Sequence, residues 1–481
     1  MLDIDWRPDK DVDRPIHKQI AEFIKKKIAA GEWPVGSVLP PQRQLALQIG
    51  VNRSTIVSAI EELIAEGLLE GNRRAGTRVI NNTWSLLNAL PPPDWSDYIR
   101  SGAYNPNQDA VQKVNKYEYV PDIIRLGTGE LAPGLVSSDG MQQVLGRLAG
   151  KRNAMGYVEG KGLPELREEI GKHLRGMGVE ASPASILVVS GALQAFQLIS
   201  VGLLHRGATV FVEKPSYLYS MRVFQSAGMQ LHGLPMDEDG IQIKSLLRQR
   251  KQHNGSILCT IPSFHNPTGI LMTEERRKEL VAVCEKEQLP IIEDDIYGEL
   301  WLDSPPPKPL KSIDKNGLVL YIGGLSKALC PGLRIGWVVA PEPVIDRLAD
   351  IKMQTDYGSS SLSQWAAVEW LSGGLYRENL NHVRAQLRER RRLMLELLDR
   401  YFKDIAEWST PAGSFYVWTR IKADIPIQKL FDKALSNGIL LNPGYIYDNS
   451  MNSYLRLSYA YASPEEMERG MRRLAQLIKE M

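Results

Sequence analysis

The strongest constraint on the fold of this chain is a regular alternation of short apolar runs and longer helical segments beyond about residue 122. The apolar runs are ILVVS at 186–190, TVFVE at 209–213, SILCTIP at 256–262, LPIIED at 289–294 and LVLYIGG at 318–324. Strand-like runs that alternate with helical patterns are typical of a parallel sheet covered by helices. The sequence therefore predicts an α/β domain with a mostly parallel sheet.

The stretch from 186 to 204 allows a second interpretation, because it carries no formal charge and approaches the length of a membrane span. Ser190 and Gly191 interrupt the apolar run, and Gln194 and Gln197 follow within a helical pattern. A strand, a turn and a helix explain these residues better than a span does. We therefore expect no membrane-spanning segment.

The composition of the chain changes near residue 80. The segment 81–120 has little periodicity and contains three consecutive prolines at 91–93, which favour a stiff, extended backbone. We interpret this segment as an interdomain linker, parts of which dock on a domain through its tryptophans and tyrosines. The predicted domains are then residues 12–80 and residues 121–481.

Charge and cysteine content narrow the environment of the protein. The chain has 58 Lys and Arg against 56 Asp and Glu, so any nucleic-acid site must be a local feature. Its three cysteines are too few and too scattered for a disulfide scaffold or a zinc site, and we expect no metal. They suit a reducing compartment, and the acidic start lacks the apolar core of a signal peptide. We expect a cytoplasmic protein.

The first eighty residues carry the pattern of a small helical domain. Isoleucines recur every four residues from Ile16 to Ile28 and predict one amphipathic helix. A second short helix is expected from about Pro41 to Gly50, and a third begins after Asn52, a residue type that caps helices. Two short helices joined by a tight turn predict a helix-turn-helix.

The third predicted helix would expose Arg53, Ser54 and Thr55 in its first turn, where a recognition helix meets bases and phosphates. The segment LLEGNRRAGTRVI at 68–80 would follow as a β-hairpin wing. Residues 14–80 carry ten Lys and Arg against six Asp and Glu. A helical domain with a solvated basic face accounts for this pattern as well as DNA binding does.

Residues 15–79 resemble the winged-helix domain of GntR-type bacterial regulators. The motifs that carry the resemblance are LP..R.LA at 39–46, R.T at 53–55 and L..EGLL at 63–69. The resemblance implies contacts with double-stranded operator DNA for Arg43, Arg53, Ser54, Thr55 and the wing around Gly76. Pro41 stands where the family usually has serine, and Arg74 stands near the place of the first wing glycine.

Two segments that follow predicted strands offer groups for an anion and a ligand oxygen. In SGALQAF at 190–196, a Ser-Gly turn that opens a helix presents backbone N–H groups to a phosphate. In PSFHNPTG at 262–269, the amide of Asn266 can bind a ligand oxygen. An ordinary glycine turn and an ordinary Asn-Pro turn explain each segment when it is taken alone.

Two further segments carry acids, a lysine and an arginine. IIEDDIYGEL at 291–300 ends an apolar strand in three acids, which is costly unless they are solvated or paired, and one of them could hold a ligand cation. IGGLSKALCPGLRIGW at 322–337 pairs an amine nucleophile, Lys327, with an anion clamp, Arg334. Taken alone, a solvated strand end and a surface lysine explain these residues.

The order and spacing of the four segments resemble the fold type I aminotransferases that use pyridoxal 5'-phosphate, across about residues 122–481, with a smaller α+β part beside the large sheet. The resemblance implies that Lys327 forms the Schiff base with the cofactor, Asp294 pairs its pyridine nitrogen, Asn266 and Tyr297 bind its phenolic oxygen, and Tyr217 stacks on its ring. The phosphate would lie on the turn of Ser190, Gly191, Ala192 and Gln194 with Ser326 and Arg334. Tyr157 would reach the phosphate of a neighbouring subunit, and Arg456 would grip a substrate or effector carboxylate.

Two positions depart from known members of the family. Many aminotransferases have serine three residues before the lysine, where this chain has Gly324. Leu218 and Tyr219 follow Tyr217 at a place where regulators that sense γ-aminobutyrate have an arginine nearby. The effector is therefore expected to be a different amino acid or amine.

The two halves together resemble the MocR subfamily of GntR-type regulators, whose members are typically head-to-tail homodimers. The resemblance implies a pyridoxal-phosphate-dependent transcriptional regulator that senses an amino acid or related amine by aldimine exchange and alters operator binding. We keep two alternatives open: a sensor of pyridoxal phosphate itself that controls cofactor synthesis, and an active aminotransferase with an accessory DNA-binding domain. The lysine, aspartate and arginine serve sensing and turnover equally.

Overall fold

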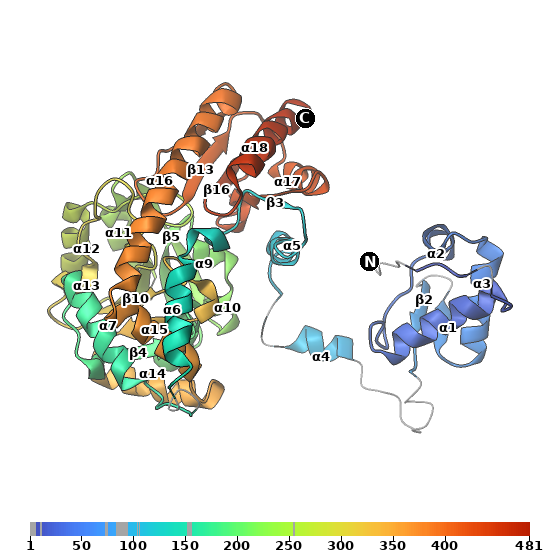
Figure 1. The fold of residues 1–481 in the computed structure, drawn as a ribbon, viewed down its shortest axis with the longest axis horizontal. Coiled ribbons are helices and arrows are strands. Elements are labelled where there is room, and N and C mark those ends of the chain that lie inside the picture. Colours follow the sequence, from blue (N-terminus) through green and yellow to red (C-terminus); the bar gives the residue numbers. More distant parts are fainter. Residues whose placement is uncertain are drawn as a thin grey trace. The chain divides into compact units, whose positions relative to one another are not determined.

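The chain forms two compact units, Met1–Ala103 and Tyr104–Met481. The computed structural model describes residues 6–9, 12–72, 76–82, 95–102, 104, 106–151, 156–253 and 255–481. The first unit holds a small domain of helices and a hairpin, and the second holds the large α/β domain (Figure 1).

The first unit contains a winged helix-turn-helix. Helices α1 (Ile16–Ala29), α2 (Gln42–Ile49) and α3 (Arg53–Ala65) precede an antiparallel hairpin of β1 (Leu69–Asn72) and β2 (Gly76–Val79). These elements confirm the predicted helices and the predicted wing, whose tip at residues 73–75 lies outside the described residues.

An apolar core holds the winged helix-turn-helix together. Ile24 from α1, Leu45 from α2, Leu63 from α3 and Val79 from β2 are buried in it. The isoleucine stripe of α1 therefore packs as predicted. Asn52 precedes α3 as expected, but its side chain makes no capping hydrogen bond to the helix.

The predicted linker contains two helices, α4 (Trp95–Ser101) and α5 (Asp109–Tyr117). Ala110, Val111 and Val114 of α5 are buried in the core of the second unit. Part of this segment therefore docks, as predicted, but through small aliphatic side chains. Tryptophan and tyrosine were expected to dock, yet among those that the structure describes in this segment Trp95, Tyr98, Tyr104 and Tyr119 are exposed, and Tyr117 alone packs partly against the core. The prolines at 91–93 lie outside the described residues.

The second unit is built on an eight-stranded sheet in the order β4-β11-β10-β9-β8-β5-β6-β7. The strands are β4 (Ile186–Val189), β5 (Thr209–Lys214), β6 (Gln230–Asp237), β7 (Gly240–Ile241), β8 (Gly255–Thr260), β9 (Ile291–Asp294), β10 (Val319–Gly324) and β11 (Gly336–Val339). From β10 to β6 the neighbours are parallel, whereas β11 runs antiparallel to both β10 and β4, and β7 antiparallel to β6. All five predicted strands are confirmed.

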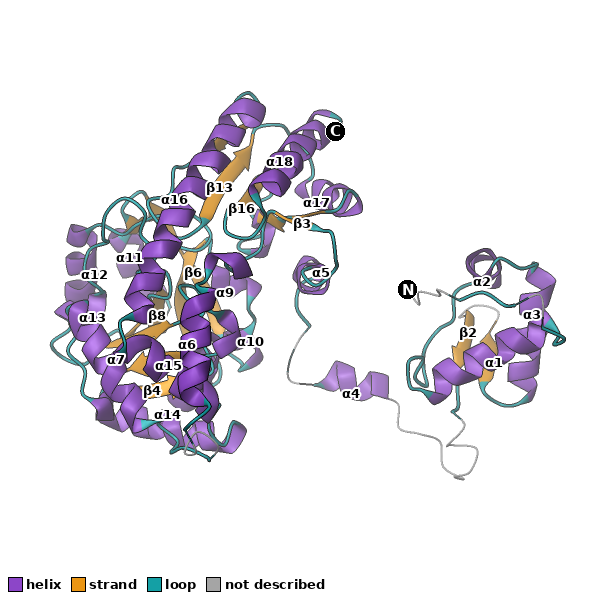
Figure 2. Ribbon diagram, viewed as in Figure 1, coloured by secondary structure: helices purple, strands orange, loops and turns teal. Residues whose placement is uncertain are grey.

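Helices cover both faces of this sheet (Figure 2). Ile186 and Val188 of β4 point to one core, and Leu187 and Val189 point to another, as the pleat of a strand requires. The first core receives α6 (Ser138–Leu148), α7 (Pro164–Gly176) and α15 (Ser361–Ser372). The second receives α8 (Ala192–Leu203), α10 (Val223–Ser226) and α14 (Glu342–Thr355), while α11 (Ile243–Gln252), α12 (Glu274–Lys286) and α13 (Leu310–Ile313) surround a further cluster.

The uncharged stretch 186–204 forms β4, a turn and α8, which confirms the strand, turn and helix predicted there. Within the described residues, no helix combines the length and the apolar content that crossing a bilayer requires.

A smaller α+β part follows the large sheet. Strands β12 (Ala406–Trp408), β13 (Tyr416–Ile421), β16 (Tyr454–Ser458) and β15 (Asn442–Pro443) form an antiparallel sheet, and β14 (Ile439–Leu440) pairs in parallel with β3 (Ile124–Arg125). Helices α16 (Leu375–Phe402), α17 (Ile427–Ser436) and α18 (Pro464–Lys479) accompany them, and α9 (Tyr217–Ser220) is a short turn near the large sheet. Short 3₁₀ turns lie at Pro133–Leu135, Pro183–Ser185, Pro331–Leu333 and Gly444–Ile446.

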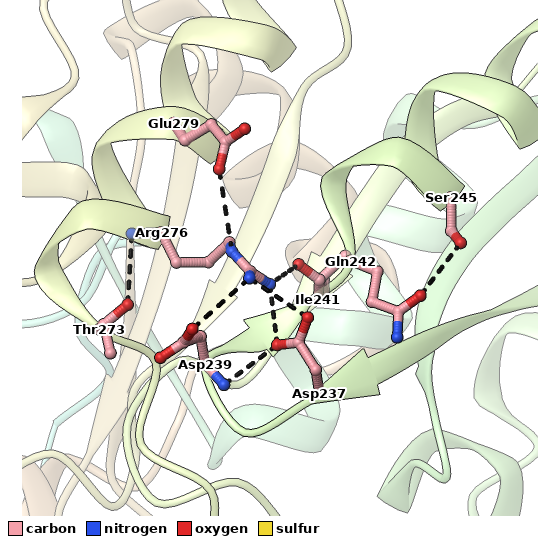
Figure 3. A network of polar contacts seen from close by, with 8 residues as sticks. All are labelled: Asp237, Asp239, Ile241, Gln242, Ser245, Thr273, Arg276 and Glu279. Carbon is pink, nitrogen blue, oxygen red and sulfur yellow. Dashed lines mark hydrogen bonds and ion pairs between the residues drawn. The ribbon is translucent and has the colours of Figure 1, made fainter.

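Arg276 ties α12 to the turn between β6 and β7 (Figure 3). Its guanidinium donates to both carboxylate oxygens of Asp237 at 3.0 and 3.2 Å and to the carbonyl oxygen of Ile241 at 2.5 Å. Asp239 and Glu279 lie within 4 Å of the same group. This network shapes the edge of the large sheet.

Candidate functional site

A cavity of about 340 Å³ lies in the second unit where the carboxyl ends of β9 and β10 meet. Its wall includes the predicted residues Gly191, Ala192, Tyr217, Asn266, Asp294, Tyr297, Ser326, Lys327, Arg334 and Arg456. Parallel strands end at the same edge of a sheet, so residues far apart in the chain converge there. Ser190, Gln194 and Tyr157 do not line the cavity.

The turn between β4 and α8 is shaped for close approach. Gly191 has a φ of 92°, and a Cβ atom there would stand 2.6 Å from Nη2 of Arg334. That nitrogen donates a hydrogen bond of 2.7 Å to the carbonyl oxygen of Ser190. The side chains of Ser190 and Gln194 donate to the Asp356 carboxylate at 3.3 and 3.1 Å. Gly191 and Arg334 therefore face the cavity, whereas Ser190 and Gln194 hold the turn.

Lys327 follows the end of β10 and lines the cavity. Its Nζ donates a hydrogen bond of 2.6 Å to the carbonyl oxygen of Gly129. A Cβ atom on Gly324 would lie 3.1 Å from the Ile335 carbonyl oxygen and 3.2 Å from Cα of Gly336. The backbone therefore leaves little room for the serine that many relatives have there, and Ser326 is the hydroxyl that lines the cavity near the lysine.

The acids at the end of β9 are buried, and two of them are bound within the protein. Glu293 accepts hydrogen bonds from the N–H groups of Leu310 and Lys311 at 2.7 and 2.8 Å. Asp295 accepts a bond of 3.1 Å from the Tyr321 hydroxyl. Burial raises the pKa of both Glu293 and Asp295 above the usual range of a carboxyl group. Hydrogen bonds within the protein, rather than contact with solvent, therefore compensate the burial of Glu293 and Asp295.

Asp294 is the acid that faces the cavity. Burial raises its pKa to about 7, and one long hydrogen bond of 3.4 Å from the N–H of Ile296 opposes that shift. A buried carboxylate is stabilised by a cation placed beside it. The position suits a protonated ring nitrogen of a ligand.

Arg456 is buried and oriented by neutral partners. Its Nη1 donates to Oδ1 of Asn266 at 2.9 Å, and its Nη2 donates to the carbonyl oxygen of Gly127 at 2.8 Å. The guanidinium lies 4.0 Å from the centre of the Tyr416 ring, and its Nε is buried without a partner among the described residues. The Asn266 amide also donates to the Tyr297 hydroxyl at 3.3 Å. A buried, uncompensated guanidinium suits a ligand carboxylate.

Several cavity residues were not predicted. Tyr416 and Tyr447 surround Arg456, and Val114 and Glu118 belong to the segment that was interpreted as a linker. Tyr416 opens β13, which had no recognisable motif, so no local signal pointed to it. The spacing of Ala110, Val111 and Val114 was a helical signal that could have found α5.

The two predicted tyrosines outside the main motifs lie in different places. Tyr217 begins α9 and lines the cavity, and burial raises its pKa to about 12. Tyr157 is 86% exposed and packs edge to face with Tyr357, 5.3 Å between ring centres. Tyr157 is therefore not part of the cavity of its own chain.

The first unit places its predicted DNA-contacting residues at the surface. Arg53 and Ser54 in the first turn of α3 are exposed, and so is Arg43 on α2, while Thr55 is half-buried. Gly76 opens β2 with a φ of 83° and is exposed. Neither Arg43 nor Arg53 takes part in an ion pair with any described acid. These arginines present free positive charge at a helix-turn-helix, as phosphate binding requires.

Each of the two units matches a known protein family. Residues 121–474 match the model of aminotransferase class I and II, and residues 16–79 match that of the bacterial regulatory proteins of the gntR family. YisV of Bacillus subtilis, an uncharacterized HTH-type transcriptional regulator, is 52% identical over 99% of this chain and 98% of its own length. The HTH-type transcriptional regulator NorG of Staphylococcus aureus is 36% identical over 92% of this chain and 100% of its own.

Solved structures resemble the second unit. A kynurenine aminotransferase of Pyrococcus horikoshii, in complex with PMP, has a TM-score of 0.75 and 28% identity, covering 81% of this chain and 99% of that one. The α-aminoadipate aminotransferase LysN of Thermus thermophilus, complexed with N-(5'-phosphopyridoxyl)-L-leucine, has a TM-score of 0.74 and 28% identity, with the same coverage. The chain therefore belongs to the MocR-type regulators, in which a gntR-family domain is fused to a class I and II aminotransferase domain.

Proposed function

We propose that this protein is a pyridoxal-phosphate-dependent regulator of transcription in the bacterial cytoplasm, whose second unit senses an amino acid or related amine. The observation that carries the proposal is one cavity that unites Lys327, Asp294 and Arg456 in a chain that also presents an exposed recognition helix. An amine nucleophile, a buried acid and a buried guanidinium match the three functional ends of a cofactor–amino acid pair.

The cavity residues fit pyridoxal phosphate. Its reactive carbon would be held by Lys327, its ring nitrogen by Asp294, its phenolic oxygen by Asn266 and Tyr297, and its phosphate by Gly191, Ala192, Ser326 and Arg334. The fit rests on the buried Asp294 carboxyl, which has no ion pair among the described residues, and on the close approach of the Arg334 guanidinium to Gly191, which a Cβ atom there would obstruct. Tyr217 lines the same cavity and offers a ring to stack on.

The bound cofactor would supply an electrophilic carbon to which the amine of an effector can attach in place of Lys327. Arg456 would bind the effector carboxylate, since its Nε has no partner among the described residues and its other nitrogens are already oriented. Asp294 would keep the ring nitrogen protonated, because a cation beside it restores its charge. The three residues thus select a molecule that has both an amine and a carboxylate.

The first unit would read an operator with Arg53, Ser54 and Thr55 in the major groove and with Arg43 and the Gly76 wing on the backbone. We infer a homodimer, head to tail in its arrangement, which would present two such heads to paired half-sites. The exposure of Tyr157 supports a role outside its own subunit, at the phosphate of the partner's cofactor.

One experiment tests the proposal as a whole. An operator is selected from a random DNA library with the full-length protein, and amino acids are then titrated while absorbance and operator affinity are measured on the same samples. We expect a spectral change and a matching change in affinity, with little repeated turnover when a 2-oxo acid is present in excess. Rapid turnover without a change in DNA binding would favour the aminotransferase alternative. A response to pyridoxal phosphate alone would favour the cofactor sensor.

A further inference from the structure

Helix α5 forms one wall of the cavity. Val111, Val114, Asn115 and Glu118 line the cavity together with Lys327. Val111 and Val114 are buried, so the helix is anchored in the core of the second unit. Any effector bound at the lysine therefore lies beside the segment that follows the first unit in the chain.

Lys113 adds a polar anchor on the other side of α5. Its Nζ bonds to Asp432 at 2.9 Å and to Asp109 at 3.0 Å. These hydrogen bonds raise the pKa of Lys113 well above its usual value, so the anchor is charged at neutral pH. The end of α5 at Glu118 is thereby held at the cavity.

Each charged residue that lines the cavity, apart from one acid, either suits a group of the cofactor or effector or has a charged partner in the protein. Arg334 suits a phosphate, Asp294 a ring nitrogen and Arg456 a carboxylate. Glu130 also lines the cavity, but its carboxylate lies 3.6 Å from the Arg125 guanidinium. Within the part of the chain that the structure describes, the Glu118 side chain has neither a hydrogen bond nor an ion pair.

We propose that the effector is an amino acid with a second amine on its side chain, and that the Glu118 carboxylate selects it by binding that amine. The proposal rests on the proposed function, because it names the ligand class of the same cavity. Arg456 and Glu118 give the cavity one positive and one negative group, which match the carboxylate and the distal ammonium of a basic amino acid.

The electrostatics of the cavity agree with this assignment. Glu118 is half-buried, and its charge acts on the cavity interior: after burial, it is the largest cause of the raised pKa of Glu130. A distal ammonium between these two carboxylates would relieve their repulsion. A neutral side chain of the same length would leave the repulsion between the two carboxylates unchanged.

The test compares ligands that differ only in the distal amine. Isothermal titration calorimetry on the full-length, cofactor-loaded protein would measure L-lysine against L-norleucine and L-ornithine against L-norvaline. Because a charge-assisted hydrogen bond is gained, we expect the basic member of one pair to bind about tenfold more tightly or better. The Glu118→Gln variant should lose that preference and keep its affinity for the neutral member.

Glu287→Gln is the matched control, since Glu287 is also a half-buried residue at the C-terminal cap of a helix, α12, and does not line the cavity. It should retain the preference, and thermal unfolding would check that both variants are folded. Neutral amino acids that bind wild type as tightly as basic ones would overturn this inference and leave the proposed function standing. An equal loss for both ligands in Glu118→Gln would also overturn it. Absence of binding by every amino acid would overturn the proposed function as well.

Discussion

The winged helix and the cavity use charged residues in opposite ways. Arg43 and Arg53 are exposed and make no ion pair with the described acids. Asp294 and Arg456 are buried, at 2% and 4% exposure, and their surroundings orient them before any ligand arrives. The winged helix thus presents exposed, hydrated charge to a long polyanion, whereas the cavity holds buried, oriented charge for a small molecule of defined shape.

The difference has an energetic side. Exposed arginines cost the folded protein little, and their contribution to DNA binding declines as salt increases. A buried charge without a partner opposes folding, so the cavity should be the less stable of the two sites when no cofactor is bound. Substitutions in one region should therefore leave the other intact, and four predictions test this separation.

The largest effect is expected at Lys327. Lys327→Ala should abolish covalent attachment of pyridoxal phosphate, because its Nζ is the amine that reaches the cavity. Borohydride reduction followed by peptide mapping checks this, and the label in wild type should lie on the peptide with Lys327. Non-specific DNA binding by the variant should equal that of wild type. A label on any other lysine would contradict the assignment.

Asp294 should make the cofactor-free protein less stable as pH rises. Its folded pKa of about 7 exceeds the unfolded value of 3.8, so the folded state binds more protons in between and stability falls as pH increases through that window. From pH 5 to pH 8 the loss is about 3 kcal/mol. Asp294→Asn lacks this dependence. Urea unfolding should therefore show that the stability of the variant rises relative to that of wild type as pH increases. If the difference in unfolding free energy between wild type and Asp294→Asn stays constant with pH, Asp294 does not titrate in this range.

Arg53→Ala should weaken operator binding by about 1–3 kcal/mol if Arg53 contacts a base. Its exposed position in the first turn of α3 motivates this prediction. Fluorescence anisotropy at several salt concentrations separates a lost base contact, which relaxes specificity, from a lost phosphate contact, which lowers the salt dependence. The cofactor absorbance should be unchanged. Unchanged operator affinity at every salt concentration would show that Arg53 does not contact the DNA.

The smallest functional effect is expected at Arg276, which lies outside both sites. Arg276→Ala breaks the bonds to Asp237 and Ile241 and should reduce stability by about 1–2 kcal/mol. Thermal unfolding measures the loss, and both cofactor absorbance and operator affinity should match wild type. A change in either one would show that the network in Figure 3 supports a functional site.

Local pattern was sufficient to predict the three helices and the hairpin of the winged helix-turn-helix. The isoleucines of α1, the cap position at Asn52 and the exposed first turn of α3 follow from spacing within single helices. Each of these features depends on neighbours a few residues away, so a sequence window contains the relevant interactions. The capping bond of Asn52 did not form, because the orientation of one side chain is not a property of the pattern.

The large domain shows what local pattern leaves out. Its five apolar runs became adjacent strands, but the antiparallel insertion of β11 between β10 and β4 had no sequence signal. The helical spacing of α5 was overlooked in a segment dominated by prolines and polar residues. Aromatic residues were expected to dock there, whereas burial selected small aliphatic side chains that fit the existing core.

The sequence by itself determined that the chain has two halves, which residue types each half uses, and that lysine, aspartate and arginine motifs follow strand ends. The family resemblance had already pointed to Asp294, and only the tertiary structure supplied the physical reason: Glu293 and Asp295 are hydrogen-bonded within the protein, whereas Asp294 lines the cavity. It also placed α5 against the cavity and left the Glu118 carboxylate there without a partner among the described residues. These contacts join different segments of the chain, from Glu293 and Leu310, 17 residues apart, to Lys113 and Asp432, 319 residues apart, so no spacing rule within one segment contains them.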